Sequence, residues 1–208
     1  MTALADFQRY FLACPLVAII RGVTPGEVEA VGDALIRAGI RIIEVPLNSP
    51  DAFVSIARLS ARCRGRALIG AGTVLDTESM TRAAAAGAEL IVSPNTNVEI
   101  ISATVRAGLV SAPGYFTPSE GFAALAAGAH ALKLFPAEAA PPAVVKAQRA
   151  VLPKDVPLIV VGGITPDRMA DYLAAGANGF GLGGALFRPG NTADQVSRQA
   201  HGFVEALP

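Results

Sequence analysis

Two charged side chains interrupt segments of the chain that are otherwise apolar. Lys133 stands in Ala131-Leu132-Lys133-Leu134-Phe135-Pro136, and Glu44 stands in Ile42-Ile43-Glu44-Val45-Pro46-Leu47. Burial lowers the pKa of a lysine, and a neutral lysine amine can attack a ketone to form a Schiff base. A carboxyl group beside that amine can move the protons of imine formation. The pattern indicates Schiff-base chemistry, although a structural ion pair between the two groups would leave the same pattern.

Other residues at the ends of apolar segments could hold an anionic substrate. Arg21 directly follows the first such segment and could bind a carboxylate or a phosphate in a bidentate manner, unless it is a surface arginine. Thr73, after Gly70-Ala71-Gly72, offers a hydroxyl group and backbone donors that suit a carboxylate. Pro94 and Phe135 could form apolar walls, although such residues are more often plain packing.

Two glycine clusters lie late in the chain, at Val161-Gly162-Gly163-Ile164 and at Gly181-Leu182-Gly183-Gly184. Glycine allows close approach of the backbone to a ligand. Phosphate sites in parallel barrels are often built from the loops after strands seven and eight. We expect a phosphate site at Gly162, Gly163, Gly183 and Gly184.

The elements that position these residues alternate regularly. Apolar runs with the near-continuous hydrophobicity of buried parallel strands alternate with amphipathic stretches, several of which end in an Ala-Gly or Ala-Ala-Gly signal for helix termination. The glycines expected to end helices are Gly39, Gly87, Gly108, Gly128 and Gly176. A cap residue precedes proline at four expected helix starts, Thr24-Pro25, Ser49-Pro50, Thr117-Pro118 and Thr165-Pro166. The expected strands are Val17–Ile20, Arg41–Leu47, Ala67–Val74, Leu90–Pro94, Leu109–Pro113, Ala131–Phe135, Leu158–Ile164 and Phe180–Leu186.

Eight strands that alternate with helices predict an α/β fold, a single (β/α)8 TIM barrel over residues 1–208. Residues 2–14 are expected to form an extra N-terminal helix that closes the bottom of the barrel. An open doubly wound sheet is the competing fold, but no G-x-G-x-x-G motif opens the first helix. In a barrel, chemistry is placed at the C-terminal ends of the strands.

Composition excludes several classes of function. Lys and Arg together number 17, as do Asp and Glu, so the chain shows no basic excess for nucleic acid or for an amphipathic membrane segment. The two histidines, His130 and His201, lack the spacing of a metal site, and no metal or other cofactor is expected. Two isolated cysteines, with neither a signal peptide nor a long apolar run, favour a cytoplasmic protein.

At the strand ends the sequence resembles a known family. Val17-Ala18-Ile19-Ile20-Arg21-Gly22, Glu44-Val45-Pro46-Leu47-Asn48-Ser49-Pro50, Ile69-Gly70-Ala71-Gly72-Thr73-Val74, Ser93-Pro94-Asn95 and Leu132-Lys133-Leu134-Phe135-Pro136 are similar to segments of the 2-keto-3-deoxy-6-phosphogluconate/galactonate aldolases. The resemblance implies a homotrimer of (β/α)8 barrels and a class I aldolase that uses no metal. It makes Lys133 the imine-forming residue and Glu44 the acid/base.

The resemblance also implies the substrate. Arg21 and Thr73 would hold it, and the two glycine clusters would bind its phosphate, although several members have serine where Gly184 stands. Gluconate-type members tend to carry an Arg-Thr pair where this chain has Asn48-Ser49, and threonine where it has Val161. The pattern therefore resembles the galactonate branch, which would cleave 2-dehydro-3-deoxy-6-phosphogalactonate to pyruvate and D-glyceraldehyde 3-phosphate.

Three other functions stay open from the sequence. The first is the same reaction on the gluconate epimer, which differs at C4. The second is a phosphate-binding barrel with isomerase or synthase chemistry, which would not need a lysine inside a strand. The third is a non-catalytic sensor of sugar phosphates.

Overall fold

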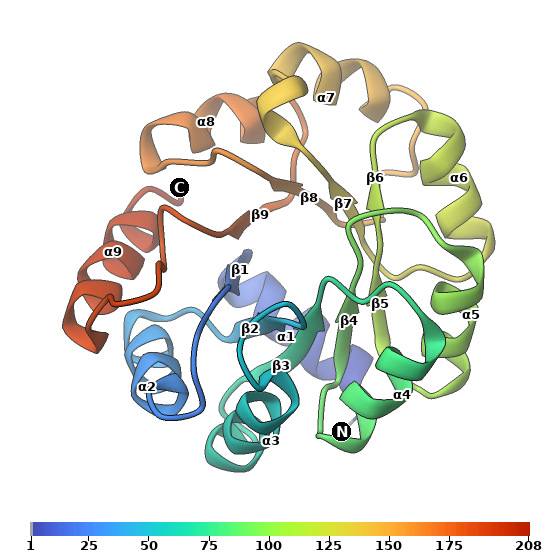
Figure 1. The fold of residues 1–208 in the computed structure, drawn as a ribbon. Helices are drawn as coiled ribbons and strands as arrows, with labels where there is room; N and C mark the ends of the chain where they lie inside the picture. The colour runs from blue at the N-terminus through green and yellow to red at the C-terminus, as the bar shows by residue number, and fades with distance from the viewer. Residues whose placement is uncertain (1) are drawn as a thin grey trace.

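A computed structural model describes residues 2–208 of the protein, and its parallel strands form a barrel surrounded by helices (Figure 1). The observed architecture is the predicted (β/α)8 barrel with an extra N-terminal helix. The strands are β1 Leu16–Ile19, β2 Ile42–Pro46, β3 Leu68–Gly72, β4 Leu90–Val92, β5 Val110–Ala112, β6 Gly114–Tyr115, β7 Leu132–Leu134, β8 Leu158–Val161 and β9 Gly179–Leu182. The helices are α1 Ala3–Ala13, α2 Val28–Ala38, α3 Ala52–Cys63, α4 Thr77–Ala85, α5 Val98–Arg106, α6 Pro118–Ala126, the 3-10 turn η1 Ala137–Ala139, α7 Pro142–Arg149, α8 Pro166–Ala174 and α9 Ala193–Glu205.

One segment of chain, Val110–Tyr115, closes the barrel. The sheet runs in the order β5-β4-β3-β2-β1-β9-β8-β7-β6, so its two edges are β5 and β6. These edges are consecutive in sequence and are separated only by Pro113, which has no backbone N–H. On one side the segment pairs with β4, and on the other side it pairs with β7. The prediction of one fifth strand ending at Pro113 is therefore corrected to two short strands that together fill one place in the barrel.

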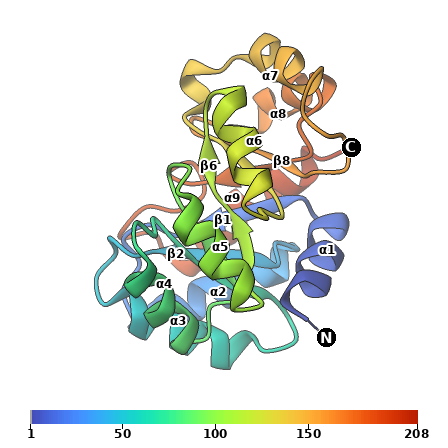
Figure 2. The same ribbon diagram turned by 90° about the vertical axis from the view of Figure 1, so that its right-hand side faces the viewer.

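Alternate residues of each strand face two different cores. Val17 and Ile19 belong to a cluster inside the barrel, whereas Leu16 and Ala18 pack between the strands and the helices. The interior cluster also includes Phe7 and Phe11 of α1, whose rings stack with their centroids 5.4 Å apart. Figure 2 shows α1 at one end of the barrel, so the predicted closing role of the N-terminal helix is confirmed.

Helix ends follow the sequence signals more closely than helix starts do. All five predicted terminating glycines have positive φ values, at Gly39, Gly87, Gly108, Gly128 and Gly176. Thr117 and Thr165 precede helices that begin with proline, and Thr117 forms a capping box with Glu120. The starts expected at Pro25 and Pro50 are wrong, because α2 begins at Val28 and α3 at Ala52. The hydroxyl of Ser49 instead accepts a hydrogen bond from the backbone N–H of Gly22.

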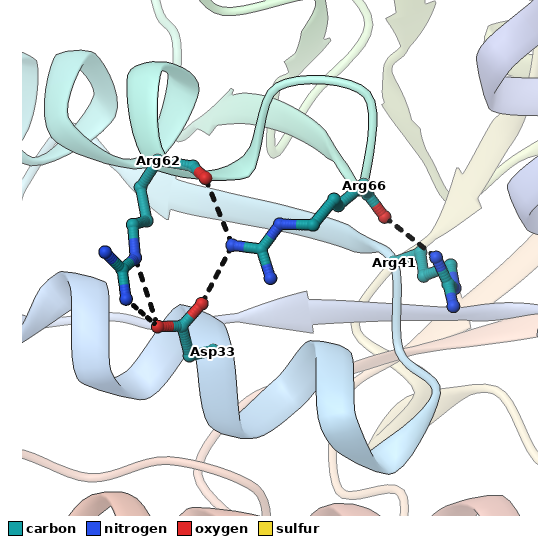
Figure 3. A network of polar contacts seen from close by, with 4 residues as sticks. All are labelled: Asp33, Arg41, Arg62 and Arg66. Atoms are coloured by element: carbon teal, nitrogen blue, oxygen red, sulfur yellow. Dashed lines mark hydrogen bonds and ion pairs between the residues drawn. The ribbon is translucent and has the colours of Figure 1, made fainter.

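A carboxylate on α2 joins this helix to α3 (Figure 3). Asp33 accepts hydrogen bonds from Nε and Nη2 of Arg62 and from Nη2 of Arg66, at 3.1, 2.7 and 2.9 Å. These ion pairs hold the pKa of Asp33 below its usual value. The clamp lies on the outside of the barrel and fixes the helices that flank β2. Within residues 2–208, no helix is both long and apolar enough to cross a membrane.

Candidate active site

A cleft of about 520 Å³ opens among the residues that follow the C-terminal ends of the strands. Most of the predicted site residues line it, and they come from widely separated strands of the barrel. Glu44 lies deeper, in a smaller cavity that it shares with Lys133. The predicted residues that line the cleft are Arg21, Thr73, Pro94, Lys133, Phe135, Val161, Gly162, Gly163, Gly183 and Gly184.

Lys133 reaches the barrel interior because its neighbours on β7 face outward. Leu132 and Leu134 belong to the core between strands and helices, so the residue between them points inward. Its side chain is buried, and Nζ lies 5.0 Å from the centroid of the Phe135 ring. Burial lowers the pKa of Lys133, the negative charge of Glu44 opposes this shift, and the positive charge of Arg21 adds to it. Lys133 is therefore more readily neutral than an exposed lysine.

Glu44 is placed in the same interior by the same alternation. Ile43 and Val45 pack outward, and Glu44 itself is only 1% exposed. Burial raises its pKa to about 7, against the opposing effects of Lys133 and Arg21. Its Oε2 atom has no hydrogen-bond partner within the described residues 2–208. A carboxyl group with a pKa near neutrality can both donate and accept a proton at physiological pH.

The glycine at position 72 makes room for this carboxyl group. A Cβ atom built on Gly72 would collide with all three terminal atoms of the Glu44 side chain. The sequence suggested that Gly70-Ala71-Gly72 exposes donors around Thr73. The structure adds that Gly72 on β3 is required for the position of Glu44 on β2, a relation between strands that local sequence does not reveal.

Arg21 is oriented at one side of the cleft by two polar neighbours. Its Nη1 donates to Oδ1 of Asn48 at 2.5 Å, and its Nη2 donates to Oγ1 of Thr73 at 3.4 Å. Asn48 is not among the residues that line the cleft, but it orients Arg21, which does line it. Thr73 has a φ of 56°, which is rare for a β-branched residue and marks backbone strain at this side of the cleft.

The two glycine clusters follow neighbouring strands, β8 and β9, and both line the cleft. Gly162 and Gly163 have φ values of 118° and 58°, and a Cβ on either would collide with the Glu138 side chain. Gly183 faces open space, with no atom within 4 Å of a Cβ built there. The clusters thus leave the backbone accessible and provide open volume for a bulky group. Val161, at the end of β8, adds an apolar side chain next to them.

A second, smaller cavity of about 20 Å³ lies in the barrel interior. Glu44 and Lys133 line it together with apolar side chains, including Phe7 of α1, Val17 and Ile159. Two ionisable groups thus share an apolar environment that α1 helps to enclose. This enclosure is the physical cause of both pKa shifts.

Sequence reasoning missed two charged residues of the cleft, Glu138 and Arg188. Glu138 lies on η1 after β7, and Arg188 lies in the loop after β9. Both are the first charged residues beyond the strand ends, which is the signal that could have identified them. Among residues 2–208, no group of three or more His, Cys, Asp and Glu side chains is arranged to hold a metal ion.

Comparisons with known proteins identify relatives that match most of the chain. Residues 9–199 match the family model described as KDPG and KHG aldolase. The 2-dehydro-3-deoxy-6-phosphogalactonate aldolase of Escherichia coli (strain K12) is 45% identical over 192 residues, which are 92% of this chain and 94% of that protein. A solved structure described as native KDPGal is 45% identical, with a TM-score of 0.91 over 92% of this chain and 93% of the other. The KDPG aldolase of Legionella pneumophila, solved with pyruvate captured at low pH as a covalent carbinolamine intermediate, is 26% identical, with a TM-score of 0.84 over 98% of each chain.

Proposed function

The chain belongs to the KDPG and KHG aldolase family, and from that membership we propose that Lys133 is its Schiff-base lysine and Glu44 its acid/base. The observation that carries this assignment is the shared, apolar environment of the two groups at the base of a cleft. Burial there favours the neutral amine of Lys133 and raises the pKa of Glu44 to about 7. These are the protonation states that imine formation at neutral pH requires.

The substrate that fits best is 2-dehydro-3-deoxy-6-phosphogalactonate. The Escherichia coli relative carries that name and aligns with nearly the whole chain. Arg21 suits the C1 carboxylate, and the glycine clusters suit the 6-phosphate. Val161 offers no hydroxyl group to the substrate, whereas a threonine there would do so. Discrimination between the C4 epimers can rest on such a difference.

The first half of the reaction builds the imine. The neutral Nζ of Lys133 attacks the C2 carbonyl carbon, and its electron pair forms the new C–N bond. Glu44 in its acid form supplies the proton that lets the C2 oxygen leave as water. The product is an iminium ion on Lys133, whose positive charge withdraws electrons from C3 and C4.

The second half breaks the carbon chain. The Glu44 carboxylate takes the proton of the C4 hydroxyl, the C3–C4 bond breaks, and its electrons move to the iminium to form an enamine. Glyceraldehyde 3-phosphate leaves as the aldehyde. Protonation of the enamine at C3 and hydrolysis of the resulting iminium release pyruvate and restore Lys133.

Borohydride reduction with pyruvate tests this assignment. We expect a stable mass addition on the peptide that contains Lys133, because borohydride reduces the imine. Lys133→Met should remove the adduct, and Lys146→Met, which changes an exposed lysine on α7, should retain it. An adduct on another residue, or no adduct at all, would refute the role of Lys133. In a lactate-dehydrogenase-coupled assay, the phosphogalactonate epimer should be the better substrate.

The proposed assembly is a homotrimer, as the family resemblance implies. Exposed apolar side chains occur on one sector of the molecule around α4, α5 and α6: Leu75, Val98, Phe116 and Phe122. Contact with further copies of the chain would remove them from water. Light scattering should give a trimer mass for the wild type, and Phe122→Asp should reduce it. Val151→Asp, at an exposed valine outside this sector, should leave the mass unchanged.

The proposed location is the cytoplasm. Both cysteines, Cys14 and Cys63, are buried free thiols, which is typical of proteins kept in a reducing compartment. Fractionation of cells should place the enzyme with cytoplasmic markers.

A further inference from the structure

The outer rim of the cleft, where Gly184 and Arg188 lie, has a feature that the catalytic assignment does not use. Both residues are exposed and line the cleft, close to the two glycine clusters. A Cβ built on Gly184 would meet only Nε of Arg188, at 3.9 Å. The chain thus has open space next to a guanidinium group at this rim.

The loop after β9 holds Arg188 in place. Its Nε donates to the carbonyl oxygen of Gly184 at 2.8 Å, and its backbone N–H donates to Oδ1 of Asn191 at 2.8 Å. The turn itself is closed by the backbone N–H groups of Leu186 and Phe187, which donate to the carbonyl oxygen of Gly183. Neither Nη1 nor Nη2 of Arg188 makes a hydrogen bond to any residue in the range 2–208. The guanidinium is therefore oriented through one nitrogen while its two terminal nitrogens stay available.

The other charged groups near this rim are accounted for. Arg21 is engaged by Asn48 and Thr73, which orient it. Arg168 donates to the carbonyl oxygen of Gly163 and to the hydroxyl of Tyr172. Glu138 lies against Gly162 and Gly163 with a negative charge that repels an anion. A phosphate held by these glycines would be repelled by Glu138, and a nearby cation would offset that repulsion.

We propose that Arg188 binds the phosphate group of the substrate through Nη1 and Nη2, at a rim where Gly184 has no side chain of its own. This inference rests on the proposed function and adds a substrate-binding residue to it. The planar guanidinium matches two phosphate oxygens, and a hydrogen bond to a charged partner is stronger than a neutral one. Arg21 and Arg188 would then hold the two anionic ends of one substrate.

The test compares two aldehydes in the synthetic direction, with pyruvate as the common partner. In Arg188→Gln, the KM for glyceraldehyde 3-phosphate should rise roughly 10- to 100-fold, the range expected for losing a charge-assisted hydrogen bond. The KM for unphosphorylated glyceraldehyde should stay within about twofold. Arg198→Gln on α9 makes the same charge change at an exposed arginine away from the cleft and should alter neither constant. Glu138→Gln should shift the KM for the phosphorylated aldehyde in the opposite direction.

Two further variants separate phosphate binding from a structural role of Arg188. Gly184→Ser meets no steric obstacle, so the double variant Gly184→Ser/Arg188→Gln should recover part of the lost affinity for glyceraldehyde 3-phosphate. A loop that had merely lost its anchor would not be repaired by this hydroxyl, and both aldehydes would then suffer alike. Thermal stabilisation by inorganic phosphate should also disappear in Arg188→Gln and persist in Arg198→Gln.

Equal losses for the two aldehydes, or an unchanged KM for glyceraldehyde 3-phosphate, would overturn the role of Arg188. The proposed function is tested separately by the borohydride adduct, because pyruvate carries no phosphate. A wild-type adduct on Lys133 together with unchanged phosphate discrimination in Arg188→Gln would leave the aldolase assignment intact and remove only this inference.

Discussion

At the scale of single residues, the chemistry depends on how Glu44 is solvated. Its carboxyl group is almost completely buried, and burial outweighs the attraction of Lys133 and Arg21, so its pKa rises to about 7. The unfolded chain would ionise the same group near its ordinary value of 4.5. Between pH 4.5 and about pH 7, Glu44 is therefore protonated in the folded protein and ionised in the unfolded chain. The stability that this group contributes is complete below pH 4.5 and is lost as the pH rises towards 7.

Replacement of Glu44 by glutamine should reveal this coupling. Glu44→Gln removes the titration, so its free energy of unfolding relative to wild type should increase between pH 5 and pH 8 by roughly 1–3 kcal/mol. Turnover should fall roughly 10²–10⁴-fold, because the acid/base is lost. Urea denaturation at both pH values measures the first effect, with Glu205→Gln on α9 as an exposed control. A pH-independent stability difference would show that Glu44 is ionised in the folded protein.

Val161 is the position at which we expect a substitution to change the proposed epimer preference. It lines the cleft beside Gly162 and is only 7% exposed. Val161→Thr replaces a methyl group by a hydroxyl group of similar size. This should shift the ratio of kcat/KM values towards the phosphogluconate epimer by roughly 10-fold. Coupled assays on the two epimers measure the ratio. Val151→Thr makes the same exchange on the surface and should leave it unchanged, and an equal ratio in both variants would remove Val161 from substrate selection.

At the scale of elements, the positions of strands could be predicted because each buried strand carries a continuous apolar run. The observed β1 and β4 lie within about two residues of their predicted bounds. Lys133 and Glu44 lie within strands, β7 and β2, as the sequence predicted. Strand ends were less predictable. The last predicted strand continued to Leu186, but β9 ends at Leu182, because the chain turns back at Gly183 with hydrogen bonds that hydrophobicity does not encode.

Features that depend on contacts between distant segments could not be predicted. The close approach of Gly72 to Glu44 joins two neighbouring strands, and the closure around Pro113 depends on pairing with both β4 and β7. Glu138 on η1 and Arg188 in the loop after β9 carry only their place beyond a strand end as a signal, because no periodic pattern indicates whether such side chains turn towards the cleft. Sequence thus identified residues whose type was anomalous for their strand and missed those that only tertiary structure makes unusual.

The clamp between α2 and α3 should contribute modestly to stability. Asp33→Asn removes an ion pair with two half-exposed arginines, so we expect Tm to fall by no more than about 2–4 °C at pH 7 and low salt. Because the folded pKa of Asp33 is lowered, its contribution is present at neutral pH and is lost as the pH falls below the ordinary aspartate value. Scanning calorimetry at pH 7 and pH 3 measures this. Asp171→Asn on α8 is an exposed control. A difference in Tm between wild type and Asp33→Asn that is larger at pH 3 than at pH 7 would contradict the expectation.

At the scale of the whole molecule, α1 connects the stability of the fold to the chemistry of the site. Phe7 is 1% exposed, stacks on Phe11 and lines the cavity that contains Glu44 and Lys133. The N-terminal helix therefore contributes part of the apolar surroundings that set both pKa values. Because α1 and β7 are far apart in the sequence, the sequence alone does not reveal this connection.

Truncation of Phe7 should disturb both properties together. Phe7→Ala should lower the free energy of unfolding by roughly 3–5 kcal/mol through the cavity that it leaves. Water admitted there would lower the pKa of Glu44 towards its ordinary value, so the acid limb of the pH–rate profile should move below pH 7. Phe7→Leu, which keeps most of the volume, should show smaller changes in both. If Phe7→Ala lowered the stability but left the acid limb of the pH–rate profile in place, α1 would have no influence on the pKa of Glu44.

α1 closes one end of the barrel, and the cleft opens at the C-terminal ends of the strands. In the proposed reaction the keto acid fragment is bonded to buried Lys133, and the aldehyde fragment would lie nearer the exposed Gly184. The phosphorylated aldehyde would then dissociate before water reaches the imine on Lys133. The expected kinetic consequence is ordered product release, with the aldehyde first and pyruvate second.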